Sequence, residues 1–312
     1  MIDSSAAAKV NYISNRYGYL PSIVMASVFL TLFFLSMILH LVQLVKFRRY
    51  GFMGSMVVGC ALEAVGWSLR LYGHKHVASR SPYIAELTLL VIAPTFFSAA
   101  LYWALGIIFA LVAPTKSFLP TKWFKVVFIS SDFAALVIQA VGGGMAGAAG
   151  DDTKKLNTDS KVMLAGIALQ LAVMTLYVAY GIYWTCRARR QVKLAGTKMQ
   201  VMLGAMLLAS CAIIIRNGFR TAELHQGFRG KLAEKQLMML FDGVPIAFAT
   251  CLLNIIHPHW FLVTAPTVPP VADDEKATNA STTEVPVQPT NPASQESVKL
   301  PTNPASQESV KL

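Results

Sequence analysis

The chain has 312 residues, of which 54% are hydrophobic and only 14% are charged. Soluble globular domains carry about 25% charged residues, so this composition excludes an ordinary soluble domain and favours a membrane protein. The net charge of +11 could indicate a nucleic-acid-binding protein. However, the basic residues lie in short segments between long apolar runs, which is typical of a membrane-topology signal, so we expect no nucleic-acid partner.

After a polar stretch at residues 1–19, which lacks the pattern of a cleaved signal peptide, seven segments are long enough to span about 30 Å of hydrocarbon. We expect these transmembrane helices near residues 20–45, 52–72, 84–112, 124–146, 162–185, 200–221 and 237–256. The predicted fold class is therefore all-α: a polytopic membrane protein whose membrane domain, residues 20–260, is a seven-transmembrane-helix bundle.

The loops predict the orientation of the bundle. The first, third and fifth loops contain no acidic residue. Their basic residues are Lys46, Arg48, Arg49, Lys116, Lys122, Lys125, Arg187, Arg189, Arg190, Lys193 and Lys198. Short loops rich in Lys and Arg remain in the cytoplasm, so the N-terminal segment 1–19 is expected to be extracellular. The C-terminal tail is then cytoplasmic.

That tail, residues 261–312, is rich in Pro, Thr, Ser, Val and Gln, with too little apolar surface to fold, so we predict that it is disordered. The segment PTNPASQESVKL at 289–300 recurs identically at 301–312. An identical tandem copy indicates a duplicated segment and not a repeat architecture.

The most unusual stretch is CAIIIRNGFRTAELHQG at residues 211–227, where Arg216, Arg220 and Glu223 follow an apolar run. Their spacings of four and seven residues place the three side chains on one face of a helix. A charged side chain that faces lipid costs about 2.5–3.5 kcal/mol, so this face is expected to contact protein or water. Carboxylates of the other apolar segments are its natural partners.

Polar side chains also interrupt other predicted helices: Glu63, Arg70, Asp132, Gln139 and Asp242. With the orientation above, Glu63 and Asp132 lie deeper in the membrane, and the other charged residues lie in its outer third. This distribution predicts a polar cavity that opens outward. Two alternatives stay open, since individual pairs could be ion pairs that only hold helices together, and Arg70 and Arg220 could reach to the interface.

Other motifs favour structure over chemistry. Gly142, Gly143 and Gly144 end the fourth segment, and we read them as positions of close helix packing. The chain has no HExxH, GxSxG or phosphate-binding loop, no nucleophile–base pair and no Cys or His spacing typical of a metal site. We therefore predict no enzymatic activity, no metal and no cofactor. Residues 237–256 lack a lysine, which excludes a retinal Schiff base in that helix.

Five motifs in order resemble the fungal lipid-translocating exporter family, also called RTA-like after resistance to aminocholesterol. They are EAVGWSLR (63–70), APTFFSAALYWALG (93–106), SDFAALVIQAVGGG (131–144), IRNGFRTAE (215–223) and FDGVPIAF (241–248). The resemblance covers residues 15–260, and one departure is Trp67, where many members have tyrosine. It implies seven helices, a plasma-membrane location and transport of sphingoid bases, phospholipids or related toxic amphipaths, with membrane lipids as partners.

Such a substrate needs a polar path for its head group while its tails stay in lipid. We hypothesise that Glu63, Asp132 and Asp242 receive an amine or balance the arginines. The guanidinium groups of the three arginines would hold phosphate or carboxylate. The alternative is a seven-helix sensor that binds an amphipath and signals through the basic loops and the tail. The sequence does not indicate the oligomeric state.

Overall fold

The computed structural model describes residues 17, 20–47, 52–148, 153–226 and 237–257. Within this part of the chain the secondary structure is helical and contains no strand. A helix covers each of the seven predicted segments: α2 (Ile23–Phe47), α3 (Phe52–Lys75), α4 (Arg80–Val112), α5 (Thr121–Ala148), α6 (Thr153–Arg187), α8 (Thr197–His225) and α9 (Leu237–Ile255). Two short elements, η1 (Pro114–Lys116) and α7 (Arg189–Leu194), lie between the long helices. The predicted all-α class is therefore confirmed for the described residues.

Five of the described helices are long and apolar enough to cross a membrane: α2, α4, α5, α8 and the part of α6 from Asn157 to Arg187. The apolar part of α9, Leu240–Ile255, is shorter, and α3 carries Glu63 and Arg70 in its apolar run. Large apolar side chains on the outer faces support the same environment, as shown by Val24, Leu176 and Ile215, which are 71%, 63% and 55% exposed. Exposed apolar surface of this extent suits hydrocarbon, so the chain is an integral multi-pass membrane protein.

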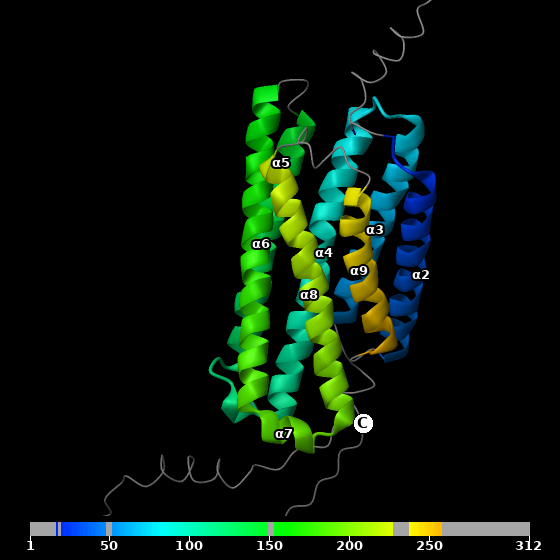
Figure 1. Cartoon of the computed structure of the whole chain (residues 1–312). Helices are drawn as coiled ribbons and strands as arrows, with labels where there is room; N and C mark the ends of the chain where they lie inside the picture. The colour runs from blue at the N-terminus through cyan, green and yellow to red at the C-terminus, as the bar shows by residue number, and fades with distance from the viewer. Residues whose placement is uncertain (1–16, 18–19, 48–51, 149–152, 227–236, 258–312) are drawn as a thin grey trace, which may run out of the picture. The chain divides into compact units, whose positions relative to one another are not determined.

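Successive long helices run in opposite directions and pack against their neighbours in sequence (Figure 1). The helix α4 lies at the centre, with 67% of its most apolar stretch buried, and it contacts α3, α5, α6 and α8. This burial follows from its sequence, because α4 is apolar on all faces and therefore packs best inside a bundle. The helix α9 packs on α8 and on α2, and so joins the two ends of the described chain.

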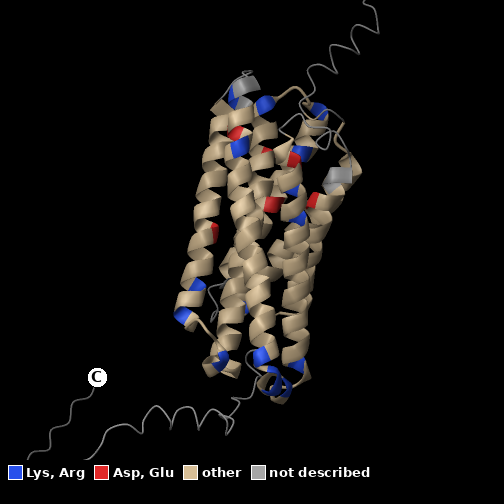
Figure 2. Cartoon of the chain, turned by 60° about the vertical axis from the view of Figure 1, so that its left-hand side comes forward, with Lys and Arg blue, Asp and Glu red and all other residues tan. Residues whose placement is uncertain are grey.

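Basic and acidic residues are distributed unequally between the two ends of the bundle. The end that contains α7 shows Lys and Arg and no acidic residue among the described residues, while the acidic residues lie between the middle of the bundle and its opposite end (Figures 1 and 2). The alternating directions of the helices bring the basic loops to this one end (Figure 1). The predicted tail, residues 261–312, lies outside the described residues, as does the N-terminal segment except for Tyr17.

Close helix packing was predicted for Gly142, Gly143 and Gly144 near the end of α5, and the structure confirms it for the first two. A Cβ atom added at Gly142 would lie 2.8 Å from the backbone nitrogen of Met163 on α6, and one added at Gly143 would overlap the side chain of Thr88 on α4. At Gly144 an added Cβ would meet nothing within 4 Å, so packing does not require glycine there.

We expect Gly142→Ala to lower the free energy of unfolding by about 1–3 kcal/mol, because the backbone of α6 would have to move. The matched change Gly144→Ala should be neutral or stabilise the helix by about 0.5–1 kcal/mol, because alanine restricts the unfolded chain. Thermal unfolding of the detergent-solubilised protein, followed by intrinsic fluorescence, measures both. Equal midpoints for the two variants would contradict close packing at Gly142.

Candidate functional site

The charged face of α8 forms a buried network with α9. Arg216 Nε donates to Asp242 Oδ1 at 3.0 Å, and Arg220 Nε donates to the same oxygen at 3.0 Å, while Arg220 Nη2 reaches Asp242 Oδ2. Arg220 Nη1 also donates to Glu223 Oε2 at 2.7 Å. The four side chains are between 1% and 8% exposed. The predicted partnership between Asp242 and the arginines is thus confirmed, and Glu223 orients Arg220 as the helical spacing indicates.

Arg216 is also bound to the helix backbone at the centre of the bundle. Its Nη2 donates to the carbonyl oxygen of Leu90 on α4, and its Nη1 donates to Asn217 Oδ1 at 3.3 Å. Pro94 follows Leu90 by four residues and lacks an N–H, so the carbonyl of Leu90 has no helical donor and is available to the guanidinium group. A proline in α4 therefore creates the acceptor for a charged residue of α8.

A second buried pair joins α3 to α4. Arg70 Nη1 lies 2.8 Å from Glu86 Oε1, and Tyr17 donates its hydroxyl to Glu86 Oε2 at 2.6 Å. Burial and the Glu86 carboxylate raise the pKa of Tyr17, so the phenol keeps its proton and acts as the donor. Arg70 is close enough to Asp242 and Glu223 for electrostatic interaction, so the two networks adjoin.

Glu63 lies farther than Arg70 from the C-terminal end of α3, and its direct polar contacts are few. Its Oε2 accepts a hydrogen bond from Trp67 Nε1 at 3.1 Å, and among the described residues it forms no ion pair within 4 Å. Its side chain is 2% exposed and interacts electrostatically with Arg216 and Asp242. Glu63 is therefore a buried acidic group beside the arginines whose charge is not taken up by a direct partner.

Asp132 and Gln139 do not join this network. Asp132 lies in the middle of α5, near Tyr102 and Ser98 of α4. The Tyr102 hydroxyl donates to Met174 Sδ at 3.6 Å, and the Ser98 hydroxyl donates to the carbonyl oxygen of Pro94 at 3.1 Å. Neither carboxylate oxygen of Asp132 therefore accepts a hydrogen bond of ordinary geometry.

Gln139 donates to Gln170 Oε1 on α6 at 3.0 Å, and both glutamines are fully buried. Asp132 and Gln139 therefore lie apart from the charged network of α3, α4, α8 and α9: Asp132 lies near α4, and Gln139 bonds to α6.

The outward-opening polar cavity that the sequence predicts is not found among the described residues. The charged side chains contact one another, and the space beside Arg220 and Glu223 amounts to about 10 Å³. The physical reason is charge complementarity: Arg220 pairs with Glu223 and shares Asp242 with Arg216, so the charged side chains contact one another directly.

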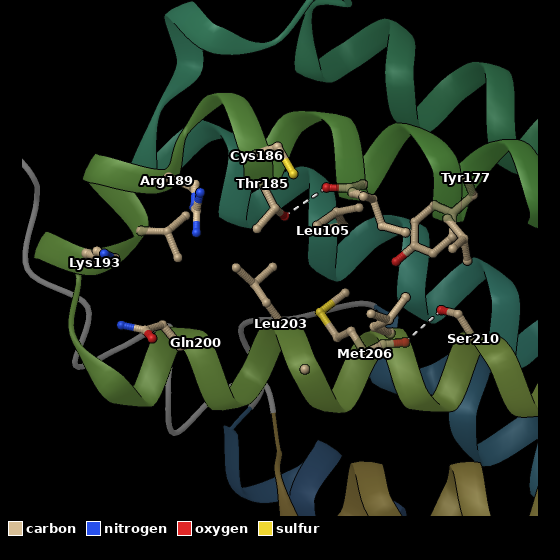
Figure 3. A pocket seen from close by; sticks show the side chains of 16 residues that line it. Leu105, Tyr177, Thr185, Cys186, Arg189, Lys193, Gln200, Leu203, Met206 and Ser210 are labelled. Atoms are coloured by element: carbon tan, nitrogen blue, oxygen red, sulfur yellow. Dashed lines mark hydrogen bonds between the residues drawn. The ribbon is translucent and has the colours of Figure 1, made fainter.

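A larger cavity lies at the basic end, between α6 and α8 (Figure 3). We call it the α6–α8 groove; it has a volume of about 460 Å³, and Figure 3 shows α6 and α8 on its two sides with Arg189 and Lys193 at one end. Its wall is mostly apolar, and it includes Leu105, Tyr177, Leu203 and Met206. This groove was not predicted from the sequence. A usable signal was the pair Gly181 and Gly204, one in each helix, which both line the groove.

Three network residues were also missed: Tyr17, Glu86 and Asn217. Glu86 falls inside the predicted helix at 84–112 but was not among the predicted site residues; it lies in the second turn of α4 and is fully buried. Tyr17 was assigned to a polar N-terminal segment, whereas it is 4% exposed and packs edge-on against Tyr83, with ring centroids 4.7 Å apart.

Comparison with known proteins adds independent information. The family model described as RTA1 like protein matches residues 56–265. The sphingoid long-chain base transporter RSB1 of Saccharomyces cerevisiae is 26% identical over 278 residues, which cover 77% of this chain and 72% of that protein.

Two further relatives come from the same yeast. Protein RTA1 is 25% identical over 65% of this chain and 64% of its own length, and protoporphyrin uptake protein 1 is 27% identical over 60% of this chain and 62% of its own length. No solved structure matches. The family model extends over more than half of the chain and includes the helices that form the buried ion-pair network, and the chain therefore belongs to the RTA1-like protein family.

Proposed function

We propose that this protein is a transporter that moves amphipathic lipids, such as sphingoid bases or phospholipids, or related toxic amphipaths, across the plasma membrane or between its leaflets. In this proposal all seven long helices span the membrane, the N-terminus is outside and the tail is cytoplasmic. The observation that carries it is the buried network of Arg70, Glu86, Arg216, Arg220, Glu223 and Asp242, which joins four helices inside an apolar bundle.

A buried network of this kind can act as a closed gate. An amphipath must move a charged head through hydrocarbon, which is costly unless protein groups replace its water. A head group could replace individual ion pairs: an amine would bind the carboxylates, and a phosphate would bind the guanidinium forks. The open and closed states would then differ in which charges are paired, which is how a ligand can shift such an equilibrium.

The relatives support the same substrate class. One is named a sphingoid long-chain base transporter and another a protoporphyrin uptake protein, and both names describe transport of amphipathic molecules. None of the relatives named above is called an enzyme, which agrees with the proposal that this chain catalyses no reaction.

The direct test is transport in vesicles that contain only the purified protein and lipid. We expect labelled sphingoid base or labelled phospholipid to change leaflet faster in vesicles with the protein than in vesicles without it. A proton gradient applied in one half of the samples shows whether transport is driven. Equal rates with and without protein, for both lipids and in both conditions, would contradict the proposal.

The rival is a sensor that binds an amphipath and signals through the tail. A closed, internally satisfied network would serve a receptor core as well as a transporter, so a functional measurement has to decide. Deletion of residues 265–312 should leave a transporter able to confer resistance to long-chain base in cells, with surface expression checked. Loss of resistance at normal expression, together with unchanged transport in vesicles, would favour the sensor.

A further inference from the structure

The interior of the α6–α8 groove has the surface of an apolar binding site. The hydroxyl of Thr185 donates to the carbonyl oxygen of Gly181 at 2.8 Å, and that of Ser210 donates to Met206 at 2.7 Å (Figure 3). Tyr177 likewise donates to the carbonyl oxygen of Leu101 at 3.2 Å. Because these hydroxyl protons are donated to backbone carbonyl oxygens, the wall offers mainly hydrocarbon to a bound molecule.

The length of the groove matches one leaflet. Its lining on α8 extends from Gln200 to Ser210, and these positions are separated by ten helical steps of about 1.5 Å, which is about 15 Å. This is about half of the 30 Å thickness of a bilayer core. Ile182 and Leu207 line the groove and are 47% and 40% exposed, so the groove opens sideways, toward the lipid. An acyl chain of one leaflet can therefore enter without crossing water.

The groove ends in positive charge. Arg189 and Lys193, four residues apart on α7, line it at the basic end of the bundle, and no Asp or Glu is among the lining residues (Figure 3). The surrounding sequence is equally one-sided, because no acidic residue occurs between Asp159 and Glu223. An amine head group at this position would be repelled. A phosphate would be attracted by both side chains, and it suits the planar donor set of arginine.

We propose that the α6–α8 groove is a binding site for a membrane lipid with a phosphate monoester head, seated in the leaflet at the basic end. One acyl chain lies between α6 and α8, and the phosphate binds Arg189 and Lys193. The site extends the proposed function by naming an anionic lipid as a ligand at a place remote from the buried ion-pair network. Only its use in transport rests on that function, because binding is measurable without transport.

The test uses the full chain in phosphatidylcholine bilayers with lipids that carry a spin label near the end of one chain. Electron paramagnetic resonance measures the immobilised fraction, and hence the association constant relative to phosphatidylcholine. We expect phosphatidate to bind about tenfold more strongly than phosphatidylcholine, since each basic residue near the membrane surface contributes on the order of a fewfold to tenfold attraction. A spin-labelled long-chain amine should show no preference.

Two pairs of variants separate a built site from general attraction. The double variant Arg189→Gln with Lys193→Gln should abolish the preference for phosphatidate. Arg187→Gln with Lys198→Gln removes the same charge from residues that do not line the groove, and it should keep most of the preference. Gly204→Leu should remove the immobilised component for phosphatidate, because an added Cβ meets nothing within 4 Å and the side chain fills the groove. Gly144→Leu, equally open but on α5, should not.

Three results would overturn the site: preference for the amine, equal loss in both double variants, or an unchanged immobilised fraction in Gly204→Leu. The last would indicate only the ordinary lipid shell. Transport is measured on the same preparations. Binding that follows these expectations without any transport would support the site and contradict the proposed function. Transport without selective binding would support the proposed function and contradict the site.

Discussion

Replacement of Arg220 by alanine should lower the free energy of unfolding by about 3–5 kcal/mol, the effect expected when one partner of a buried ion pair is removed. Arg220 contacts Glu223 at 2.7 Å and binds Asp242 through two nitrogen atoms, and its side chain is almost fully buried. Its loss would leave two acidic groups in an apolar interior with Arg216 as their neighbour. The measurement is the unfolding midpoint in a titration with denaturing detergent, with the yield of monodisperse protein as a second readout.

The double variant Arg220→Ala with Glu223→Gln tests whether charge balance is the cause. Arg216 and Asp242 would remain as an intact pair at 3.0 Å, so the double variant should be more stable than Arg220→Ala alone. Lys198→Ala removes a positive charge from an exposed position and should change stability by no more than about 0.5 kcal/mol. If Arg220→Ala behaved like Lys198→Ala, the network would not hold α8 to α9.

Glu63→Gln should reduce the rate of amine-lipid transport by about 10–100-fold while leaving the fold intact. A hydrogen bond to a charged group contributes about 1.5–3 kcal/mol, and each 1.4 kcal/mol corresponds to a tenfold change in rate. Glutamine has the same shape and can still accept from Trp67, whose bond to Glu63 is 3.1 Å long. Glu63 has no ion-pair partner among the described residues. The substitution to glutamine therefore breaks no described ion pair.

Initial rates in reconstituted vesicles, for a sphingoid base and for a phospholipid without an amine, measure this effect. The loss should be larger for the amine, because the Glu63 carboxylate would no longer balance its charge. Trp67→Phe removes the hydrogen-bond donor but keeps the carboxylate, so it should cost much less. An unchanged rate for both lipids in Glu63→Gln, at normal thermal stability, would remove Glu63 from the transport path.

Spacing along the chain predicted well where one helix decides the outcome. Arg216, Arg220 and Glu223 lie on one face of α8, as intervals of three, four and seven residues require, and Arg220 bonds to Glu223 on that face. The helical segments were also found correctly, since runs of about 20 apolar residues have few alternatives to a helix in lipid.

The spacing of residues predicted the partner of a side chain poorly where that partner lies on another helix. Glu63 and Arg70 share a face of α3, and the sequence allows them to pair, yet Arg70 pairs with Glu86 of α4. Asp132 was predicted to lie deeper than the arginines in the same cavity, but α5 packs on α4 and α6, so Asp132 lies near Tyr102 and Ser98. A helical period gives the direction of a side chain around its own axis and carries no information about which helix lies there.

The sequence by itself determined that this is an all-helical membrane protein, where its helices lie, and that its basic loops differ from the rest. Composition and periodicity are sufficient for these conclusions because a backbone in lipid must satisfy its own hydrogen bonds. Only the tertiary structure decided that the charges close into two adjoining ion-pair groups, and that an apolar groove with a basic end lies between α6 and α8. Both depend on distances between side chains of different helices, which packing across the whole bundle sets.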